Sequence, residues 1–425
     1  MFYIEKERKL PIVGEYDVIV AGAGPSGIAA AVAAGRSGVK TLLIDGTGSV
    51  GGMSTVGMMS HFTGSVGNKL YWEILDRAAK KNRLDKTPYN IHIDPELLKI
   101  TYFEMLEECG ADVLLYTAVC DVITEENKVK GIICESKSGR FALSAKAVID
   151  CTGDGDVAYK AGAAYIKGRE TDGKMQPMTL MFKLGGVDTD RAVFPGSFET
   201  LVETAKGELQ ALAKEKLPHP AGHVLLYRSP LPGIVTVNMT NVIGVDGTKA
   251  EDLTKAEIAC RKQMLPILDF LREYAPGYEN AYIIGSASFM GVRETRHFKG
   301  VQTITGEDIL SARQFDDQVV YDAHFDFDVH NLTGSGLDET GCQKYFTQKK
   351  GYTIPYGCLV PEKIDGLLLS GRNISGTHIA HSSYRVMPIC IGIGEAAGLA
   401  ASIAVKKGIN LREVSPKEIQ ALENL

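Results

Sequence analysis

Short apolar runs near the N-terminus alternate with an alanine-rich stretch, and this order predicts parallel strands joined by a helix. The run Tyr16–Ala21 leads directly into glycines, which is typical of a buried central strand. The stretch 26–37 predicts a helix, and the apolar run 40–45 predicts the next strand. Strand, glycine turn, helix and strand make one βαβ unit. Farther on, β-branched runs separated by polar turns between 112 and 149 predict three or four antiparallel strands.

The pattern changes in the middle of the chain. Helical periodicity covers 199–215 and 255–274, with two short strand-like runs between them. Toward the C-terminus, a buried strand at 367–370 and a Gly/Ala-rich helix at 388–406 resemble parts of the first lobe. The patterns therefore predict an α/β protein of two interleaved lobes. One lobe is expected to combine 1–165 with 350–425, and an α+β substrate or cap lobe is expected as the insertion 166–349.

Composition narrows the class of protein. The chain has 425 residues, of which 44% are hydrophobic and 23% charged, as in ordinary globular proteins. Its net charge of −6, without a basic block, predicts no binding to nucleic acid. The charged N-terminus is no signal peptide, and the apolar stretch Ile389–Val405 is too short for a membrane span, so a buried helix is expected there. Eight cysteines without C-x-x-C spacing suit free thiols in the cytoplasm.

The first chemical signal is the turn Gly22-Ala-Gly24-Pro-Ser-Gly27. It follows a predicted strand and opens a predicted helix, as dinucleotide-binding turns do. The glycines let the backbone approach a pyrophosphate at the helix N-terminus. Asp45 ends the second strand 18 residues after Gly27, where a carboxylate accepts ribose hydroxyls. These features predict a bound dinucleotide.

A second glycine pair distinguishes FAD from NAD. Gly51 and Gly52, followed by Met53 and Ser54, come soon after Asp45. This is the extended FAD pattern, in which the loop runs beneath the diphosphate. The strand at 147–150 leads into a turn of small and acidic residues and is expected to lie beside the first strand. For Asp154 and Asp156 in that turn, capping of the next helix is an equal alternative.

Several segments together resemble one family. They are GAGPSG, GGMS, VIDCTGDGD, MGVRETRHFKG with TGEDIL, YTIPYGCLVP, and LLLSGRNISGTHIAHSSYRVMP with GIGEAAGLAA. The chain resembles the FAD-dependent oxidoreductases that share their cofactor domain with fumarate reductases and glutathione reductase. The resemblance implies a Rossmann-like FAD-binding domain of the glutathione-reductase type. It covers nearly the whole chain, but 170–280 matches poorly. The family more often has Glu at the position of Asp45.

The resemblance also implies which residues contact FAD. Gly371 and Arg372 would lie at the ribityl-pyrophosphate, Val119 would hold the adenine, and the helix near Pro388 would point its N-terminus at the flavin. The pattern around His61 differs from that of relatives with covalent flavin, so FAD is expected to be noncovalent. The full set of expected cofactor contacts is Gly22, Gly24, Pro25, Ser26, Gly27, Asp45, Gly51, Gly52, Met53, Ser54, Val119, Thr152, Gly153, Asp154, Gly371, Arg372, Arg385, Met387 and Gly392.

The candidate catalytic residues form two polar clusters. His378, His381 and Arg385 precede the helix expected to face the flavin, and Arg293 belongs to the second cluster, Arg293–His297. Arg385 and Arg293 would hold an anionic oxygen of the substrate, and His378 or His381 would exchange the proton. Structural hydrogen bonds and ion pairs between lobes are the alternative reading of both clusters.

One further pattern combines histidines with aspartates. In 323–330, polar His324, Asp326, Asp328 and His330 alternate with apolar residues. Two His and two Asp could bind a metal, but a half-buried strand with one wet face explains the alternation as well. We favour the strand and predict no metal site.

These features predict an enzyme, an FAD-dependent dehydrogenase or reductase. Hydride would pass between a small polar organic substrate and flavin N5. The alternatives are an FAD monooxygenase, a thiazole-biosynthesis-like enzyme, or an electron-transfer subunit that passes electrons to a partner protein. The absence of a cysteine cluster for an iron–sulfur centre counts against the last. No membrane partner is expected, while a homo-oligomer and a redox partner remain open.

Overall fold

The protein has a mixed α/β fold with one large sheet at its centre. A computed structural model describes Tyr3 and residues 7–59, 61–81, 92–198, 200–336 and 350–423. The sheet has seven strands in the order β3-β2-β1-β6-β5-β4, and β17 pairs with β6 beside the end of β5. Its strands are β1 (Ile12–Ala21), β2 (Thr41–Ile44), β3 (Asp112–Leu114), β4 (Thr117–Glu125), β5 (Lys128–Ser136), β6 (Gly139–Asp150) and β17 (Leu367–Leu369).

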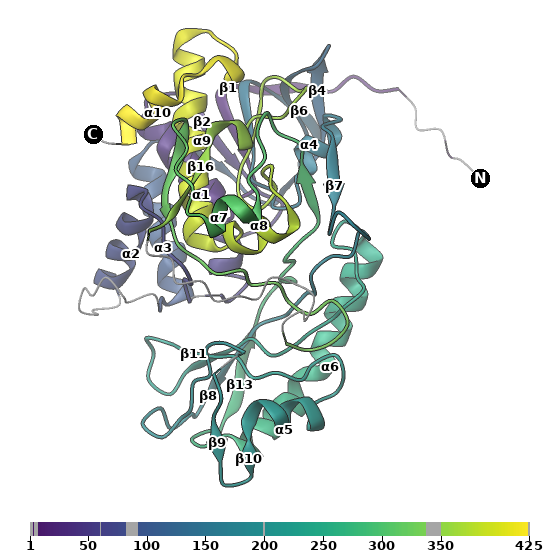
Figure 1. The fold of residues 1–425 in the computed structure, drawn as a ribbon. Coiled ribbons are helices and arrows are strands. Elements are labelled where there is room, and N and C mark those ends of the chain that lie inside the picture. Colours follow the sequence, from purple (N-terminus) through teal and green to yellow (C-terminus); the bar gives the residue numbers. More distant parts are fainter. Residues whose placement is uncertain are drawn as a thin grey trace.

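The strand directions in this sheet follow two patterns. β1 pairs in parallel with β2 and β6, β2 with β3, and β17 with β6. β4, β5 and β6 form an antiparallel meander. The predicted βαβ unit and the antiparallel strands are therefore present, and β3 joins the parallel part. Because β17 comes from the C-terminal part of the chain, the sheet needs both ends of the sequence (Figure 1).

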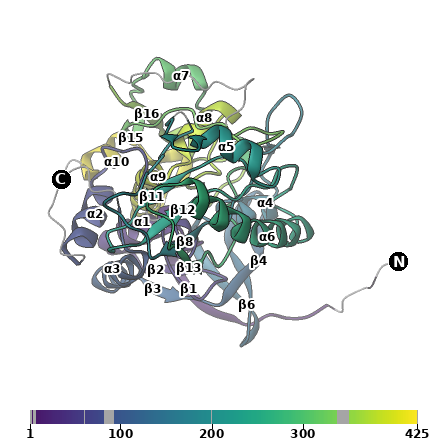
Figure 2. The ribbon, with the colours of Figure 1, turned by 90° about the horizontal axis from the view of Figure 1, so that it is seen from below.

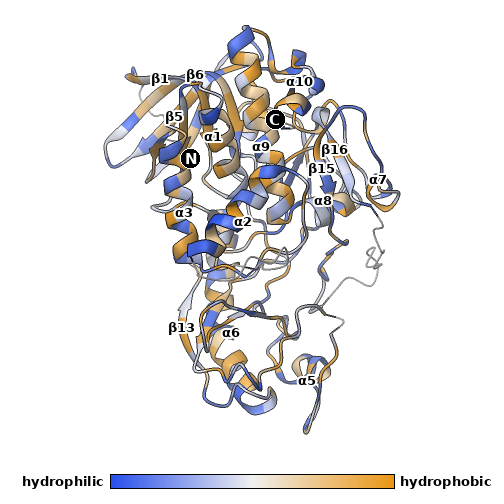
Figure 3. Cartoon of the chain, turned by 90° about the vertical axis from the view of Figure 1, so that its left-hand side faces the viewer, coloured by the Kyte–Doolittle hydropathy of each residue, from blue (hydrophilic) through white to orange (hydrophobic). Residues whose placement is uncertain are grey.

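Two helices that are distant in sequence cover this sheet together. α1 (Pro25–Arg36) and α9 (Met387–Lys407) cross at positions where α9 has glycine. A Cβ on Gly394 would lie 2.0 Å from the carbonyl oxygen of Ser26, so only glycine allows this approach. α9 is the one helix among the described residues that is long and apolar enough to cross a membrane, but 83% of its most apolar window is buried in the protein. Figure 3 shows it as a hydrophobic helix among its neighbours, and the predicted buried helix is confirmed.

A second hydrophobic core lies at the other end of the molecule. It packs between a four-stranded antiparallel sheet, in the order β11-β12-β8-β13, and the helices α5 and α6. Figure 2 views the molecule from this end. The elements are β8 (Phe182–Gly185), α5 (Leu209–Lys216), β11 (Leu226–Arg228), β12 (Val235–Val237), α6 (Ala250–Tyr274) and β13 (Tyr282–Ser286).

Three predicted details differ in the structure. The helix expected over 199–215 begins only at Leu209, because β9 (Glu203–Thr204) and β10 (Gly207–Glu208) form a hairpin before it. The Glu208 carboxylate then caps α5. The prediction of a strand over 323–330 is wrong, because β15 (Gln318–Ala323) ends at the first residue of that range. Within the range 166–349 expected for the cap, Phe298 and Phe327 pack into the first core instead of the second.

The remaining elements surround these two cores. Short two-stranded sheets pair β7 with β14 and β15 with β16. The bounds are α2 (Lys69–Lys81), α3 (Pro95–Glu108), α4 (Asp156–Lys160), β7 (Tyr165–Lys167), β14 (Arg296–Phe298), α7 (Gly306–Leu310), β16 (Tyr352–Pro355), α8 (His378–Tyr384) and α10 (Pro416–Glu423).

Candidate active site

The glycine turn between β1 and α1 has the geometry of an anion-binding site. Gly22 has a φ of +100°, and a Cβ there would lie 2.4 Å from the carbonyl oxygen of Cys151. Gly24 is the N-cap of α1, with Pro25 at the start of the helix. A Cβ on Gly24 would have no heavy atom within 4 Å. The backbone therefore leaves free space directly in front of a helix N-terminus, where its partial positive charge attracts a phosphate.

Asp45 is held beside this turn by the backbone. Its Oδ2 accepts a hydrogen bond from the Ala23 N–H at 2.7 Å, and its Oδ1 accepts bonds from the N–H and hydroxyl of Thr47. These donors orient the carboxylate at the end of β2. Asp45 also lines the cavity next to the turn, which suits a group that accepts ribose hydroxyls.

A cavity of about 780 Å³ extends from the glycine turn along the carboxyl ends of the parallel strands. On the side of the second core, the cavity is lined by Thr254, Glu257 and Ile258 of α6 and by the loop Ser288–Met290. Fifteen of the expected cofactor contacts line it, namely Gly22, Gly24, Pro25, Ser26, Asp45, Gly52, Met53, Val119, Thr152, Gly153, Asp154, Gly371, Arg372, Arg385 and Met387.

Four expected contacts have other surroundings. Gly27 faces the carbonyl oxygen of Gly22, at 1.8 Å from an added Cβ, so it lets the helix pack against the turn. A Cβ on Gly51 would meet Thr55, and the Ser54 hydroxyl donates to the Gly51 carbonyl. Gly392 packs against Asn68 and Val66. None of the four lines the cavity, and their contact with the cofactor stays a prediction.

Asp154 is not a helix cap. The N-cap of α4 is Gly155, which has a φ of +67° and receives no side-chain cap, and Asp156 is the first residue of that helix. The Asp154 Oδ1 accepts from Arg372 at 2.7 Å and from the Thr295 hydroxyl at 2.6 Å. Asp154 therefore holds the Arg372 guanidinium at the cavity wall.

A second, smaller cavity of about 270 Å³ adjoins the first. Met53, Val292, Arg372, Arg385 and Met387 line both. Its other walls come from the second core and from the segment after β15. These residues include Met59, Thr179, Met181, Phe198, Leu225, Tyr227, Asn238, Arg293, Phe325, Asp326, Asp328 and His330.

Arg385 and His330 meet at Asp328 in this smaller cavity. Arg385 Nη2 donates to the Asp328 carboxylate at 2.8 Å and to its carbonyl oxygen at 3.0 Å. His330 Nε2 lies 3.3 Å from the same carboxylate. Burial alone would raise the pKa of Asp328, but His330, Arg385 and Arg293 outweigh it and hold this pKa well below the usual range. Asp328 is therefore an anion that orients both Arg385 and His330.

Burial lowers the pKa of two further groups in the cavity, Arg293 and His330. It lowers the pKa of Arg293 to about 10, with nearby Arg385 acting in the same direction, so Arg293 stays a cation at neutral pH. Burial, assisted by Arg293, lowers the pKa of His330 to about 4 despite Asp328. His330 is thus a neutral imidazole at pH 7.

The structure separates the predicted catalytic residues into two groups. Arg385 and Arg293 line the smaller cavity, as the sequence predicts. His378 and His381 line neither cavity. Both rings are buried beside Glu294, whose Oε1 lies 2.6 Å from His378 Nδ1. The sequence instead predicts that His330 and Asp328 lie on the solvated face of a strand. Their alternation with apolar residues is the signal that could have identified them.

His61 lies away from the cofactor cavity. Its Nδ1 is 3.0 Å from that of His92, and its ring stacks on Tyr227. Burial, with His92 nearby, lowers its pKa to about 3. Noncovalent binding of FAD stays a prediction.

The larger cavity fits FAD. An open backbone at a helix N-terminus suits the pyrophosphate, Asp45 suits the ribose, and Arg372 adds a cation at the same wall. The N-terminus of α9, at Met387, also lines the cavity and can stabilise negative charge on a flavin ring. Fold and cavity together define a flavoprotein whose cofactor site lies at the carboxyl ends of parallel strands. The family described as FAD dependent oxidoreductase matches residues 17–422, and the chain belongs to it.

Known proteins agree with this class. The chain is 31% identical to the thiamine thiazole synthase of Methanococcus vannielii over 195 residues, which are 43% of this chain and 74% of that enzyme. It is 28% identical over 176 residues to a tRNA uridine 5-carboxymethylaminomethyl modification enzyme of Clostridium botulinum, over 36% of this chain and 27% of that protein.

Among solved structures the likeness concerns the fold. A geranylgeranyl bacteriochlorophyll reductase-like protein of Thermoplasma acidophilum has a TM-score of 0.50 and 14% identity, over 97% of this chain and 83% of that one. The p-nitrophenol 4-monooxygenase of Pseudomonas putida also has a TM-score of 0.50, with 11% identity, over 96% of this chain and 88% of that one. The resemblance predicted from the motifs is confirmed, and FAD is the cofactor.

Proposed function

We propose that this FAD-dependent enzyme transfers a hydride between FAD and a small organic substrate that carries one anionic group. The observation that supports this proposal most is the pair of guanidinium groups, that of buried Arg293 and that of half-buried Arg385, in the smaller cavity beside the cofactor cavity. Of the three arginines of that cavity, Arg372 pairs with Asp154 and Arg385 with Asp328, whereas Arg293 donates to the Pro177 carbonyl and keeps a positive charge that forms no ion pair among the described residues. A monoanion such as a carboxylate neutralises it.

In this proposal each residue has one task. When bound, FAD supplies the hydride acceptor or donor at flavin N5. Arg385, oriented by Asp328, and Arg293 grip the substrate anion, because a guanidinium binds two oxygens at once. Neutral His330 takes the proton that leaves the substrate heteroatom during oxidation. Methionine and aromatic side chains, among them Met59, Met181 and Phe198, exclude water from the reacting carbon.

An anaerobic titration tests the proposal. Purified protein is mixed with a panel of small hydroxy and amino acids, and the flavin band at about 450 nm is followed. Bleaching is expected with at least one acid. The matched neutral amide should bleach the flavin on the order of 100-fold more slowly, since it lacks the charge that Arg293 and Arg385 bind. Equal rates with acid and amide would contradict the role of the arginines.

A thiazole-biosynthesis-like activity is the second candidate, supported by the 31% identity to thiamine thiazole synthase. The same titration separates it from the first. Flavin that stays oxidised with every acid, in a protein that consumes oxygen only with NAD(P)H, would instead favour an FAD monooxygenase. A protein inert in both assays would direct attention to the thiazole reaction.

His330→Gln is expected to slow flavin reduction about 10²- to 10⁴-fold, the contribution of a positioned proton carrier. Because the pKa of His330 is about 4, the imidazole can accept a proton throughout the range above it. The wild-type rate should therefore be flat from about pH 6 to pH 8 and fall as the pH approaches 4. Stopped-flow reduction at a series of pH values measures both effects.

His324→Gln is the matched control for this variant. His324 also pairs with an aspartate two residues earlier, with its Nε2 2.9 Å from Asp322 Oδ1, but outside both cavities. Its rate should equal that of the wild type. A His330→Gln enzyme with the wild-type rate and pH profile would remove His330 from the mechanism.

A further inference from the structure

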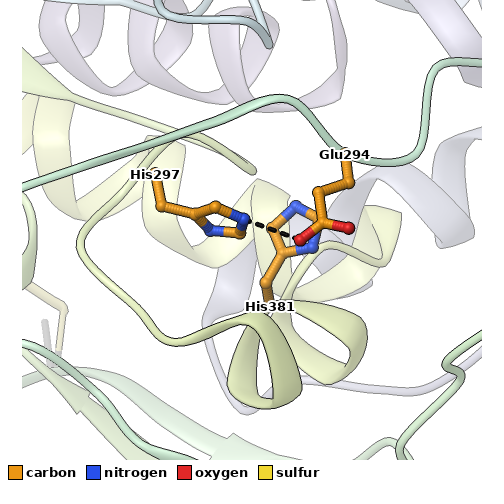
Figure 4. A group of neighbouring side chains, drawn as sticks. All are labelled: Glu294, His297 and His381. Atoms are coloured by element: carbon orange, nitrogen blue, oxygen red, sulfur yellow. Dashed lines mark hydrogen bonds and ion pairs between the residues drawn. The ribbon is translucent and has the colours of Figure 1, made fainter. Parts of the chain in front are cut away.

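Three histidines and one glutamate form a buried cluster behind the wall of the two cavities. The residues are Glu294, His297, His378 and His381, and each is at most 4% exposed. Glu294 Oε1 lies 2.8 Å from His297 Nε2 and 2.6 Å from His378 Nδ1. One ligand atom each of Glu294, His297 and His381 lie within 4.8 Å of one another. Figure 4 shows the rings of His297 and His381 beside the carboxylate.

The cluster joins two segments that are far apart in sequence. Glu294 and His297 are three residues apart at the start of β14, and His378 and His381 are three residues apart on α8. Residues at this spacing on a helix point to the same side, so α8 presents two imidazoles toward one carboxylate. Each segment contributes a pair of metal-ligating side chains.

Hydrogen bonding does not account for all of these side chains. The Nδ1 atoms of His297 and His381 and the Nε2 atom of His378 are buried without a hydrogen-bond partner. His381 packs its ring against His297, with centroids 4.5 Å apart. Burying polar nitrogens without partners is unfavourable, and apolar side chains could fill the same space. A neutral imidazole lone pair directed at a cation would give His381 a partner.

We propose that this cluster binds one divalent transition metal ion of the zinc class, with Glu294, His297 and His381 as ligands and with His378 holding the Glu294 carboxylate in place. Imidazole nitrogens and a carboxylate oxygen are the ligands that zinc takes in four-coordinate sites, at about 2.0–2.2 Å. Ligand atoms on such a tetrahedron lie about 3.3 Å apart. The hydrogen-bonded atoms would thus part by roughly half an ångström on binding.

The charges around the cluster allow a cation. Glu294 supplies a carboxylate inside it, within hydrogen-bond distance of His297 and His378. The nearest arginines are engaged elsewhere. Arg372 pairs with Asp154 and Arg385 with Asp328, while Arg296 pairs with Asp156 and lies over the Tyr159 ring.

The consequence of metal binding is structural. Its three protein ligands are each at most 4% exposed and line neither cavity, so the site is closed to substrate. The ion would tie the loop before β14 to α8, which ends directly before Arg385. Arg385 directly follows α8, and Arg293 directly precedes Glu294. The ion would therefore fix the separation of these two arginines in the smaller cavity. This inference is independent of the substrate proposed above.

Metal analysis of the purified protein tests the inference. After loading with Zn²⁺ and removal of free metal, elemental analysis should find about one zinc per chain. His381→Gln and His297→Gln should each lose most of it, whereas His324→Gln, at the surface His–Asp pair, should keep it. Wild-type protein that retains no zinc, or equal zinc in the wild type and all variants, would overturn the site.

A second measurement keeps the test valid if the variants do not fold. Treating wild-type protein with a strong chelator should lower its melting temperature, and added Zn²⁺ should restore it. FAD content is measured in parallel, so that loss of cofactor is distinguished from loss of metal. A melting temperature that neither the chelator nor Zn²⁺ changes would show that the cluster is held by hydrogen bonds alone.

Discussion

Replacing Gly24 by valine is expected to give a folded protein that no longer retains FAD. Gly24 has an ordinary extended backbone, with φ of −71° and ψ of −178°, so valine is allowed there. A Cβ at Gly24 meets no heavy atom within 4 Å, although the residue lines the cofactor cavity. The new side chain would occupy the space that the pyrophosphate needs. Affinity for FAD should fall about 100-fold or more, equivalent to about 3 kcal/mol.

The measurement is the amount of FAD that acid precipitation releases per mole of chain. Gly196→Val is the matched control, since a Cβ there also has no heavy atom within 4 Å, but Gly196 lines the smaller cavity. It should keep FAD. A Gly24→Val protein with full FAD would contradict the assigned position of the pyrophosphate. Flavin that stays with the precipitated wild type would contradict noncovalent binding.

The cofactor end of the molecule could be predicted because its requirements are local. Gly22 needs a positive φ within a single turn, and Asp45 needs only to end the next strand. Such needs leave a short, recognisable spacing in the sequence. Even here, the sequence predicts that Gly27 and Gly392 contact the cofactor, whereas in the structure a Cβ on these residues would collide with Gly22 and Asn68. A glycine required by packing and one required by a ligand look identical in a sequence.

The smaller cavity could not be predicted because its walls come from distant segments. Asp328 and Arg385 are 57 residues apart and meet through a hydrogen bond that no local pattern specifies. The alternation from His324 to His330 fits a half-buried strand equally well. In the structure this segment follows the end of β15 and lines the cavity without forming a strand. Tyr227 of β11 and Asn238, which directly follows β12, also line the smaller cavity. They come from a region that contains none of the family motifs.

His378 and His381 show that proximity in sequence does not establish a shared site. They stand close to Arg385 in sequence, and this proximity suggested a shared site. In the structure α8 turns their rings inward to Glu294, while Arg385, the C-cap of that helix, faces the cavity. Helical spacing alone would place Arg385 on the face of His381, four residues earlier, but α8 ends at Tyr384 and the long Arg385 side chain extends to Asp328 instead.

Replacing Arg385 by alanine is expected to leave FAD bound and to slow flavin reduction by the substrate about 10²- to 10⁴-fold. Arg385 lines both cavities, but Gly22–Ser26, Asp45 and Arg372 hold the rest of the cofactor without it. The loss would fall on the substrate anion, which would keep only Arg293. Stopped-flow reduction with the acid found in the titration measures the rate.

Arg385→Lys separates binding of the substrate from support of the fold. Alanine leaves the half-buried Asp328 without the arginine that pairs with it, so part of its effect could come from a disturbed cavity. Lysine keeps a positive charge for Asp328 but cannot grip two substrate oxygens at once. If Arg385 binds substrate, the lysine enzyme should have the melting temperature of the wild type and still reduce its flavin at least about 10-fold more slowly. A lysine enzyme with the full rate would mean that Arg385 serves only to neutralise Asp328, and Arg293 would then be the residue that binds the substrate anion.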